Sequence, residues 1–377
     1  MFIPVPGTST SSLSGKHMIL NPISTILSSY RPSINLSTTM MKHILLILLL
    51  SRQCYSFGNF QFPKMPWEGT SPVSGSKNAD KNALQPGDTI AVVGASGNVG
   101  KLVALRLSDS YNVNGITRDA SSLKSFFEGR SNIKLFEVDL LDEMKGRGSS
   151  KLLPALEGAH AIVICTGTTA FPTKAWSRTG EEGIAGNVVS ALVANKFSVV
   201  DALAALDEQG FNTPSNIDAK ANEFIFKTWQ KAAKVLKKRA IMLSSIGVNR
   251  RASMPFPILN ACGVLDAKAS GEDALQQCAN ESGFSYTIIR PGQLFGGPYD
   301  NNYYLGTLFQ LDKDAATQDI QLGRGDELLG DTLRSTLAEI TAQVCETDSA
   351  RDMDFACINI KGEPPSVDAL RGRLEEL

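Results

Sequence analysis

Short apolar runs alternate with amphipathic segments along most of the chain. The run Thr89–Val93 is β-branched and apolar and lies between Gly87-Asp88 and Gly94, which is typical of a buried strand. Residues 101–107 follow with helical periodicity. The same criteria predict further strands at Asn112–Thr117, 133–138, 161–165, 241–245 and 286–292. This alternation of strands and helices predicts an α/β fold built on a doubly wound parallel sheet.

A glycine-rich turn joins the first strand to the first helix. The sequence GASGNVG gives Gly94, Gly97 and Gly100 the spacing GxxGxxG. The first glycine permits the tight turn, the second lets a pyrophosphate approach the backbone, and the third lets the helix pack close to the sheet. Such glycines also occur in turns without a ligand, but here the flanking strand and helix supply the context that the motif requires. We expect the turn to bind a dinucleotide through Gly94, Ser96, Gly97, Asn98, Val99 and Gly100.

Arg118, at the end of the second predicted strand, bears on the choice of dinucleotide. An NAD site carries an acid there for the ribose 2'-hydroxyl, whereas an arginine suits the 2'-phosphate of NADP(H). Asp119 follows at once and keeps NAD(H) open, unless it caps a helix that starts near Ser121. The sequence therefore favours NADP(H) over NAD(H).

The next two strands also end in residues suited to a cofactor. The carboxyl ends of parallel strands form the ligand crevice of open α/β sheets. We therefore expect Asp139 and Leu140 at the adenine, and Thr166 and Gly167 at the ribose on the nicotinamide side.

The composition argues against several other classes of protein. The 377 residues hold 37 Lys+Arg and 38 Asp+Glu, a formal net charge of -1, so no basic field points to nucleic acid as a partner. The 6 cysteines are widely spaced without a CxxC, which predicts reduced, mostly buried thiols rather than a zinc ribbon or a dithiol motif. With only 3 histidines, a metal site built from several imidazoles is not expected.

Residues 1–68 have the composition of a targeting leader. No acid precedes Glu68, and Ser, Thr and basic residues are frequent. After Met40-Met41 come a basic start and the apolar run ILLILLL, which resemble a secretory signal and are too short to span a bilayer of about 30 Å. A signal followed by an acid-poor segment that begins at Phe57 is typical of algae with complex plastids.

The composition of the leader also fits several simpler origins. With the two-part leader, Met40 or Met41 is expected to be the start. The alternatives are a plain plastid or mitochondrial transit peptide from Met1, a secretory signal, or a gene model extended too far upstream. Residues 69–85 have the composition of a linker, so the folded domain is expected at 86–377, without a transmembrane segment.

Nine motifs extend from Thr89 to about Ile360: GASGNVG, Arg118-Asp119, VDL, TGTTAFPTKAW, NTPSNID, LSSIGV, GVLDAKASGEDAL, YTIIRPG and GRGDELLG. Together this set resembles the atypical short-chain dehydrogenase/reductases, in particular their NAD(P)-binding, NmrA-like branch in the plastids of plants and algae. The resemblance implies a Rossmann sheet with NADP(H) at its C-terminal edge, contacted also by Lys268 and Pro291. It further implies a small C-terminal α+β substrate lobe at about 293–377.

The catalytic residues of the short-chain class are only partly present. The resemblance places Ser245 as the serine that orients a carbonyl and Lys268 as the lysine of the YxxxK pair, but Val264 stands where the tyrosine acid belongs. Ser245 can instead satisfy backbone groups at the strand end, and Lys268 can be a solvated charge on a helix. Further hydroxyl groups that could substitute for the tyrosine belong to Thr168, Thr169, Tyr299, Tyr303 and Tyr304.

Two later segments need separate interpretation. Residues at about 177–211 depart from the family pattern and have helical spacing, so they are either a helical insertion over the site or a retained intron. Near the C-terminus, Asp331 is expected to cap a helix from Thr332 to about Cys345, followed by a strand at 354–360 and a final amphipathic helix at 366–377.

Two functions fit this pattern. The first is an NADPH-dependent reductase or epimerase that acts on a small carbonyl, isoprenoid or pigment-like substrate in the plastid. The second is an NADP(H)-binding protein without turnover, which would act as a redox sensor or as an assembly factor for photosynthetic complexes. The missing tyrosine favours the second, and the tyrosines at 299–304 favour the first.

Overall fold

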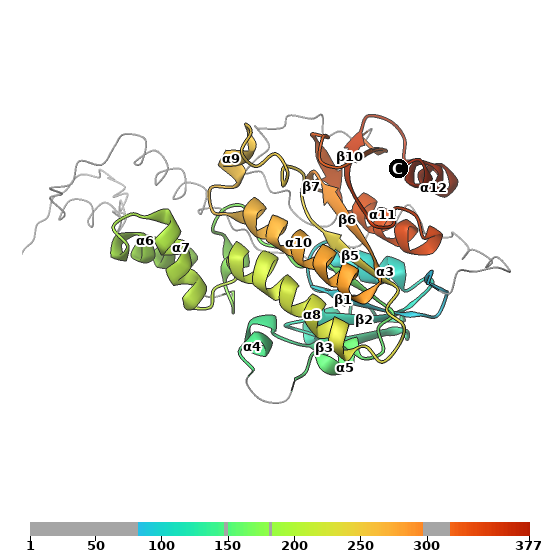
Figure 1. Cartoon of the computed structure of the whole chain (residues 1–377), viewed down its shortest axis with the longest axis horizontal. Helices are drawn as coiled ribbons and strands as arrows, with labels where there is room; N and C mark the ends of the chain where they lie inside the picture. Colours follow the sequence, from blue (N-terminus) through green and yellow to red (C-terminus); the bar gives the residue numbers. More distant parts are fainter. Residues whose placement is uncertain (1–81, 147–149, 181–182, 297–316) are drawn as a thin grey trace, which may run out of the picture. The chain divides into compact units, whose positions relative to one another are not determined.

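The computed structural model describes residues 82–146, 150–180, 183–296 and 317–377, and within these ranges the predicted sheet is present (Figure 1). Its eight strands are β1 (Thr89–Val93), β2 (Asn112–Thr117), β3 (Ile133–Glu137), β4 (Ala161–Ile164), β5 (Arg239–Leu243), β6 (Ser285–Pro291), β8 (Asp319–Arg324) and β10 (Met353–Ile360). The strand boundaries expected from sequence for β1 and β2 are confirmed, and those of β3 to β6 shift by one or two residues.

The strand order is β3-β2-β1-β4-β5-β6-β10-β8, and all neighbouring strands are parallel except β10 and β8. Strands β2 and β3 are therefore added on one side of β1, and the strands from β4 onward are added on its other side. In open α/β sheets this switch point opens a crevice at the carboxyl ends of the strands, where ligands bind. The predicted doubly wound Rossmann-type fold is confirmed.

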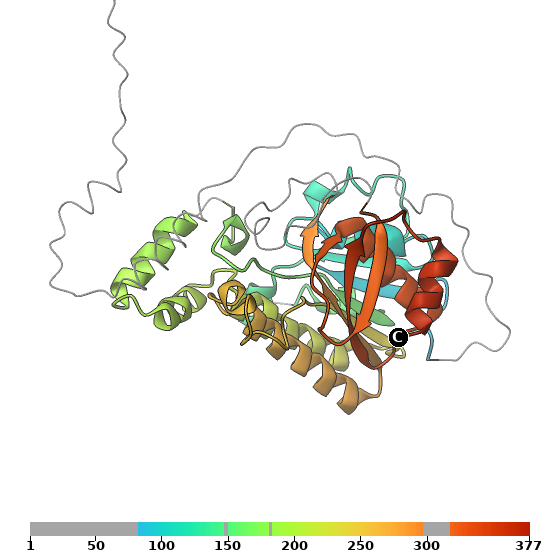
Figure 2. The same cartoon turned by 90° about the horizontal axis from the view of Figure 1, so that it is seen from above.

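Helices cover both faces of this sheet, as the two views show (Figures 1 and 2). Because successive side chains of a strand point to opposite faces, Ile90 and Val92 of β1 pack with one layer, while Ala91 and Val93 pack with the other. The first layer contains α3 (Gly100–Leu107), α11 (Arg334–Thr347) and α12 (Val367–Glu375). The second contains α5 (Leu153–Leu156), α8 (Asn222–Ala232) and α10 (Val264–Ser282).

The remaining short helices lie in the connections. They are α4 (Leu140–Met144), α9 (Phe256–Leu259), the 3₁₀ helices Ser121–Leu123 and Lys174–Trp176, and the π-helix Ser215–Ala221, which runs directly into α8. A single π-helical turn often marks a functional position, because it moves side chains out of the ordinary helical register.

The segment at 177–211 is helical, as its spacing predicts. It forms α6 (Ile184–Ala194) and α7 (Val199–Glu208), and the side chains between them make a small hydrophobic cluster of their own. Trp176 and Cys262 complete that cluster and join it to the rest of the domain. The two helices therefore share a core instead of lying as solvated chain.

The helix predicted from Thr332 is wrong at its start. Asp331–Leu333 is strand β9, which pairs in parallel with β7 (Gln293–Phe295), and α11 begins only at Arg334 without a side-chain cap. The Thr332 hydroxyl donates to the Cys357 carbonyl, and the Leu333 N–H donates to the Asn359 side chain. These partners, which are distant in sequence, hold the backbone extended.

The strand expected at 354–360 and the last helix are confirmed as β10 and α12, whose start Ser366 caps by accepting a hydrogen bond from the Ala369 N–H. β8 and β10 extend the main sheet, and α11 packs beside α3 on its face. Only the β7–β9 pair forms a separate small sheet within the part of the expected lobe that the structure describes.

The proposed leader and linker fall almost wholly outside the described residues. Among the residues that the structure does describe, none of the helices has the length and apolar character needed to cross a bilayer.

The contact between α10 and the π-helix predicts an unusual response to a glycine substitution. A Cβ on Gly271 would lie 2.5 Å from the Asp218 carbonyl oxygen, whereas a Cβ on Gly372 in α12 would have open space. Gly271→Ala should lower the free energy of unfolding by about 1–3 kcal/mol because of the overlap. Gly372→Ala should raise it by about 0.5–1 kcal/mol, as alanine ordinarily does in a helix. Urea unfolding measures both, and equal changes in the two variants would contradict this packing.

Candidate functional site

The turn between β1 and α3 has the geometry of a phosphate-binding turn. Gly94 adopts φ +84°, which a side chain would strain, and a Cβ on Gly100 would lie 2.1 Å from the Gly94 carbonyl oxygen. No side chain caps the start of α3 at Val99, and the Lys101 N–H donates to the Gly97 carbonyl at 3.1 Å. The two glycine roles expected for tight turning and close packing are confirmed, and Ser96, Gly97 and Asn98 are exposed at the turn.

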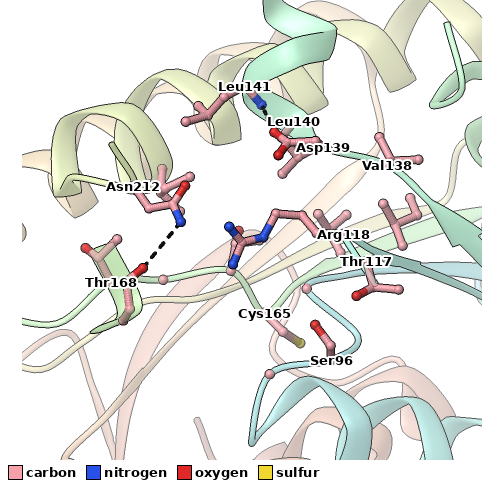
Figure 3. Close-up of a pocket in the computed structure, with 18 residues that line it drawn as sticks. Ser96, Thr117, Arg118, Val138, Asp139, Leu140, Leu141, Cys165, Thr168 and Asn212 are labelled. Carbon is pink, nitrogen blue, oxygen red and sulfur yellow. Dashed lines mark hydrogen bonds between the residues drawn. The ribbon is translucent and has the colours of Figure 1, made fainter. Parts of the chain in front are cut away.

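A cavity of about 170 Å³ runs from this turn along the ends of β2, β3 and β4 (Figure 3). It is lined by predicted cofactor residues, namely Gly94, Ser96, Gly97, Arg118, Asp139, Leu140, Thr166 and Gly167. The structure therefore brings together residues from four separate stretches of the sequence.

Arg118 and Asp119 have different environments although they are adjacent. The Arg118 side chain extends into the pocket (Figure 3). Its Nη1 donates to the carbonyl of Arg178 at 2.9 Å. Asp119 accepts hydrogen bonds from the Ser121 hydroxyl and from the N–H groups of Ser121 and Ser122, and these bonds lower the pKa of Asp119 below its ordinary value. Arg118 thus lines the crevice, while Asp119 caps the next helical turn.

Arg178 is a second guanidinium at this end of the crevice, and none of the sequence motifs indicates it. Its Nη2 lies 2.6 Å from Asp139 Oδ2 and 3.3 Å from Asp142 Oδ1. Burial works against the charged guanidinium, but the bonds to the two carboxylates outweigh it and raise the pKa of Arg178. The other Asp139 oxygen accepts the Leu141 N–H at 3.0 Å, so Asp139 also caps α4.

A larger cavity of about 540 Å³ continues from the first at the carboxyl ends of β4, β5 and β6. The two cavities share Gly97, Cys165, Thr166, Gly167, Thr168 and Ala175. The larger cavity is lined by Lys268, Ser245 and Pro291, which the family resemblance indicated as site residues, together with Asn98 and Val99. Residues that no dinucleotide motif requires, among them Gln293, Leu294, Arg334 and Leu337, form its far wall.

Lys268 is not a solvated helix charge. It is 8% exposed, and its Nζ lies 2.8 Å from Oδ1 of Asp218, which is fully buried in the π-helix. The other Asp218 oxygen accepts the Thr168 N–H at 3.0 Å and also the Thr168 hydroxyl. Lys268 therefore enters the cavity with its position fixed by a carboxylate, which is in turn fixed by the loop after β4.

The structure also shows the environments of Ser244, Ser245 and Val264. Ser245 donates to the Ile246 carbonyl at 2.9 Å, so its hydroxyl serves the local backbone, while Ser244 donates to buried Glu272. Val264 is buried in a cluster with Ile246, Val248 and Phe256. The side chain at the position that the family resemblance assigns to the tyrosine is thus hydrophobic and buried. Tyr299, Tyr303 and Tyr304 lie outside the described residues.

The cysteines of the described ranges are all free thiols: Cys165, Cys262, Cys278, Cys345 and Cys357. Burial raises the pKa of Cys165, which lies between the two cavities, so its thiol remains protonated near neutral pH. Within the same ranges no group of His, Cys, Asp or Glu could hold a metal ion.

Comparison with known proteins agrees with the crevice geometry. A family model described as NAD(P)H-binding matches residues 94–324. An uncharacterised chloroplastic protein of Arabidopsis thaliana is 24% identical over 320 residues, which is 81% of this chain and 82% of that protein.

Two solved structures are similar to this chain at low identity. A protein named as an NAD-dependent epimerase/dehydratase from Bacillus halodurans is 16% identical, with a TM-score of 0.49 over 77% of this chain and 100% of that one. The oxidoreductase YlbE of Lactococcus lactis is 20% identical, with a TM-score of 0.47 over 77% and 96% of the two chains. Because the family model covers more than half of the chain and starts at the first glycine of the turn, the protein belongs to the NAD(P)H-binding Rossmann family.

Proposed function

We propose that this protein is an NADP(H)-dependent reductase of a small carbonyl compound in the plastid. The observation that carries the proposal is the larger cavity, which extends past the predicted cofactor residues and contains the fixed ammonium group of Lys268. A protein that only held a dinucleotide would not need the additional wall formed by Gln293, Leu294 and Leu337.

The residues present suit a dinucleotide along the whole crevice. The uncapped start of α3 and the close approach of Gly100 to Gly94 suit a pyrophosphate, Arg118 suits the adenosine phosphate, and Lys268 suits the nicotinamide ribose. When bound, NADPH supplies the hydride that reduces a carbonyl carbon and is itself oxidised to NADP⁺.

The proton for the carbonyl oxygen would come from Lys268. The family tyrosine is replaced by buried Val264, and the Thr168 hydroxyl already donates its hydrogen to Asp218. An ammonium group has three hydrogens, and Asp218 engages one of those on Lys268. Lys268 can therefore pass a proton to the oxygen as the alcohol forms, and the amine regains a proton from water.

A second function is favoured by the environment of Val264. Positioned general acids contribute about 10²- to 10⁴-fold to rate, and the usual position here is filled by a hydrophobic cluster. Without effective proton transfer the protein would bind NADP(H) and turn over little, as a redox sensor or an assembly factor does.

Turnover separates these two functions. We expect the wild-type protein to oxidise NADPH in the presence of some member of a panel of quinones, enones and aldehydes. Lys268→Met should lower that rate by about 100-fold or more if Lys268 supplies the proton. Lys227→Met, on the exposed surface of α8 in an i,i+4 pair with Glu223, serves as the control and should keep the rate. Binding of NADPH with background rates across the whole panel would support the non-catalytic function instead.

Cofactor preference tests the role of Arg118. Charge-assisted bonds from a guanidinium to a phosphate contribute about 1.5–3 kcal/mol. The affinity for NADPH should therefore be at least about tenfold higher than the affinity for NADH. Arg118→Ala should remove most of this gap, whereas Arg130→Ala, which loses an exposed pair with Asp109, should keep it. Isothermal titration calorimetry measures the affinities, and equal affinities in the wild-type protein would refute the NADP(H) assignment.

Plastid location is supported by the composition of residues 1–68 and by the chloroplastic relative. Residues 41–80 fused to a fluorescent reporter should enter a complex plastid, and Phe57→Ala should stop the reporter outside it. Delivery of the reporter to mitochondria would contradict this proposal.

A further inference from the structure

The insertion that carries α6 and α7 begins at the adenosine end of the crevice. Arg118 Nη1 donates to the carbonyl oxygens of Ser177, at 3.4 Å, and Arg178, at 2.9 Å. Asn212, just past the other end of the insertion, donates from its side chain to the Ser177 carbonyl at 2.5 Å and from its backbone to the Trp176 carbonyl at 2.8 Å. The first residues of the insertion are therefore held directly against Arg118 and Asn212, two residues that line the cavity.

The same segment places the Arg178 guanidinium against two carboxylates, those of Asp139 and Asp142. Asp139 lines the adenosine cavity, and Asp142 follows it on the first turn of α4. Two carboxylates at this position would repel the 2'-phosphate that Arg118 is suited to bind. Arg178 bonds to both of them, and it also donates from Nη1 to the Gly210 carbonyl at 3.3 Å near the end of the insertion.

We propose that Arg178 is a specificity-determining residue of the cofactor site: by neutralising Asp139, it lets the adenosine end accept a 2'-phosphate. The inference rests on the proposed use of NADP(H) and assigns to the insertion a share of that site. Arg118 is the direct phosphate ligand, and Arg178 acts through Asp139.

The role of Arg178 is expected to be selective. Loss of a positive charge close to the phosphate weakens binding of a ligand with a 2'-phosphate but changes little for a ligand with a 2'-hydroxyl. A unit charge near the protein surface, acting across several ångströms, changes affinity by about fivefold to tenfold. Melting temperature is a poor readout here, because a partly exposed ion pair contributes little to stability.

The experiment uses 2',5'-ADP and 5'-AMP, which occupy only the adenosine end and differ by the 2'-phosphate. Titration calorimetry on the full domain should show that Arg178→Gln lowers the affinity for 2',5'-ADP by about fivefold to tenfold and leaves the affinity for 5'-AMP unchanged. Arg178→Lys, which keeps the charge, should retain most of the affinity. Lys196→Asn, which removes a charge at the turn between α6 and α7, is the control and should bind both ligands as the wild type does.

A double variant tests whether Arg178 acts through Asp139. Asparagine can still cap α4, so Asp139→Asn added to Arg178→Gln should restore the affinity for 2',5'-ADP. Failure to restore it would overturn action through Asp139, and unchanged 2',5'-ADP affinity in Arg178→Gln would overturn the role of Arg178 altogether. A wild-type protein that binds both ligands equally would overturn this inference together with the proposed NADP(H) preference.

Discussion

The ion pair between Lys268 and Asp218 joins the parts of the molecule that must meet for the crevice to exist. Asp218 is fully buried on the π-helix, Lys268 is on α10, and Thr168, which also bonds to Asp218, is on the loop after β4. A buried charge is costly unless its partner is present, so these three elements must be placed together or not at all. Gly271 lets α10 approach the Asp218 carbonyl closely, and this contact fixes the depth at which Lys268 enters the cavity.

The two ends of the crevice are built on different principles. At the end that contains Lys268, which we propose to hold the nicotinamide, charge is buried and compensated by Asp218. At the end that contains Arg118, which we propose to hold the adenosine, charge is partly exposed, and the compensating cation is Arg178 of the segment at 177–211. Exposed ion pairs contribute little to stability. We therefore expect the adenosine end to respond to substitution through ligand affinity and the nicotinamide end through stability as well.

Much of the fold was predictable from the sequence, because its signals are local. Strands such as β1 and β2 are indicated by runs of apolar and β-branched residues, and Gly97 and Gly100 are constrained by contacts with Gly94, within seven residues. The failure at Asp331–Leu333 has the opposite cause. Its extended backbone depends on Cys357 and Asn359, and no local pattern records those partners.

The sequence indicated many of the residues that line the crevice but not how their side chains pair. Asp218 stands in the motif NTPSNID, but its partner Lys268 is fifty positions away, so the sequence could suggest each residue and not the pair. Arg178 lies in a segment that departs from the family pattern, and only its contact with Asp139 gives it a role. Ser245 shows the reverse: the family position is filled, yet its hydroxyl bonds to the neighbouring backbone.

One crevice, from Arg118 to Lys268, is expected to hold NADP(H) in a single orientation, and a crystal structure of the domain with NADPH tests this most directly. We expect the 2'-phosphate within hydrogen-bond distance of the Arg118 guanidinium and the pyrophosphate at the start of α3. Lys268 Nζ should lie within hydrogen-bond distance of the nicotinamide ribose. A dinucleotide bound with its adenosine phosphate away from Arg118, or with its nicotinamide outside the cavity that contains Lys268, would contradict this orientation.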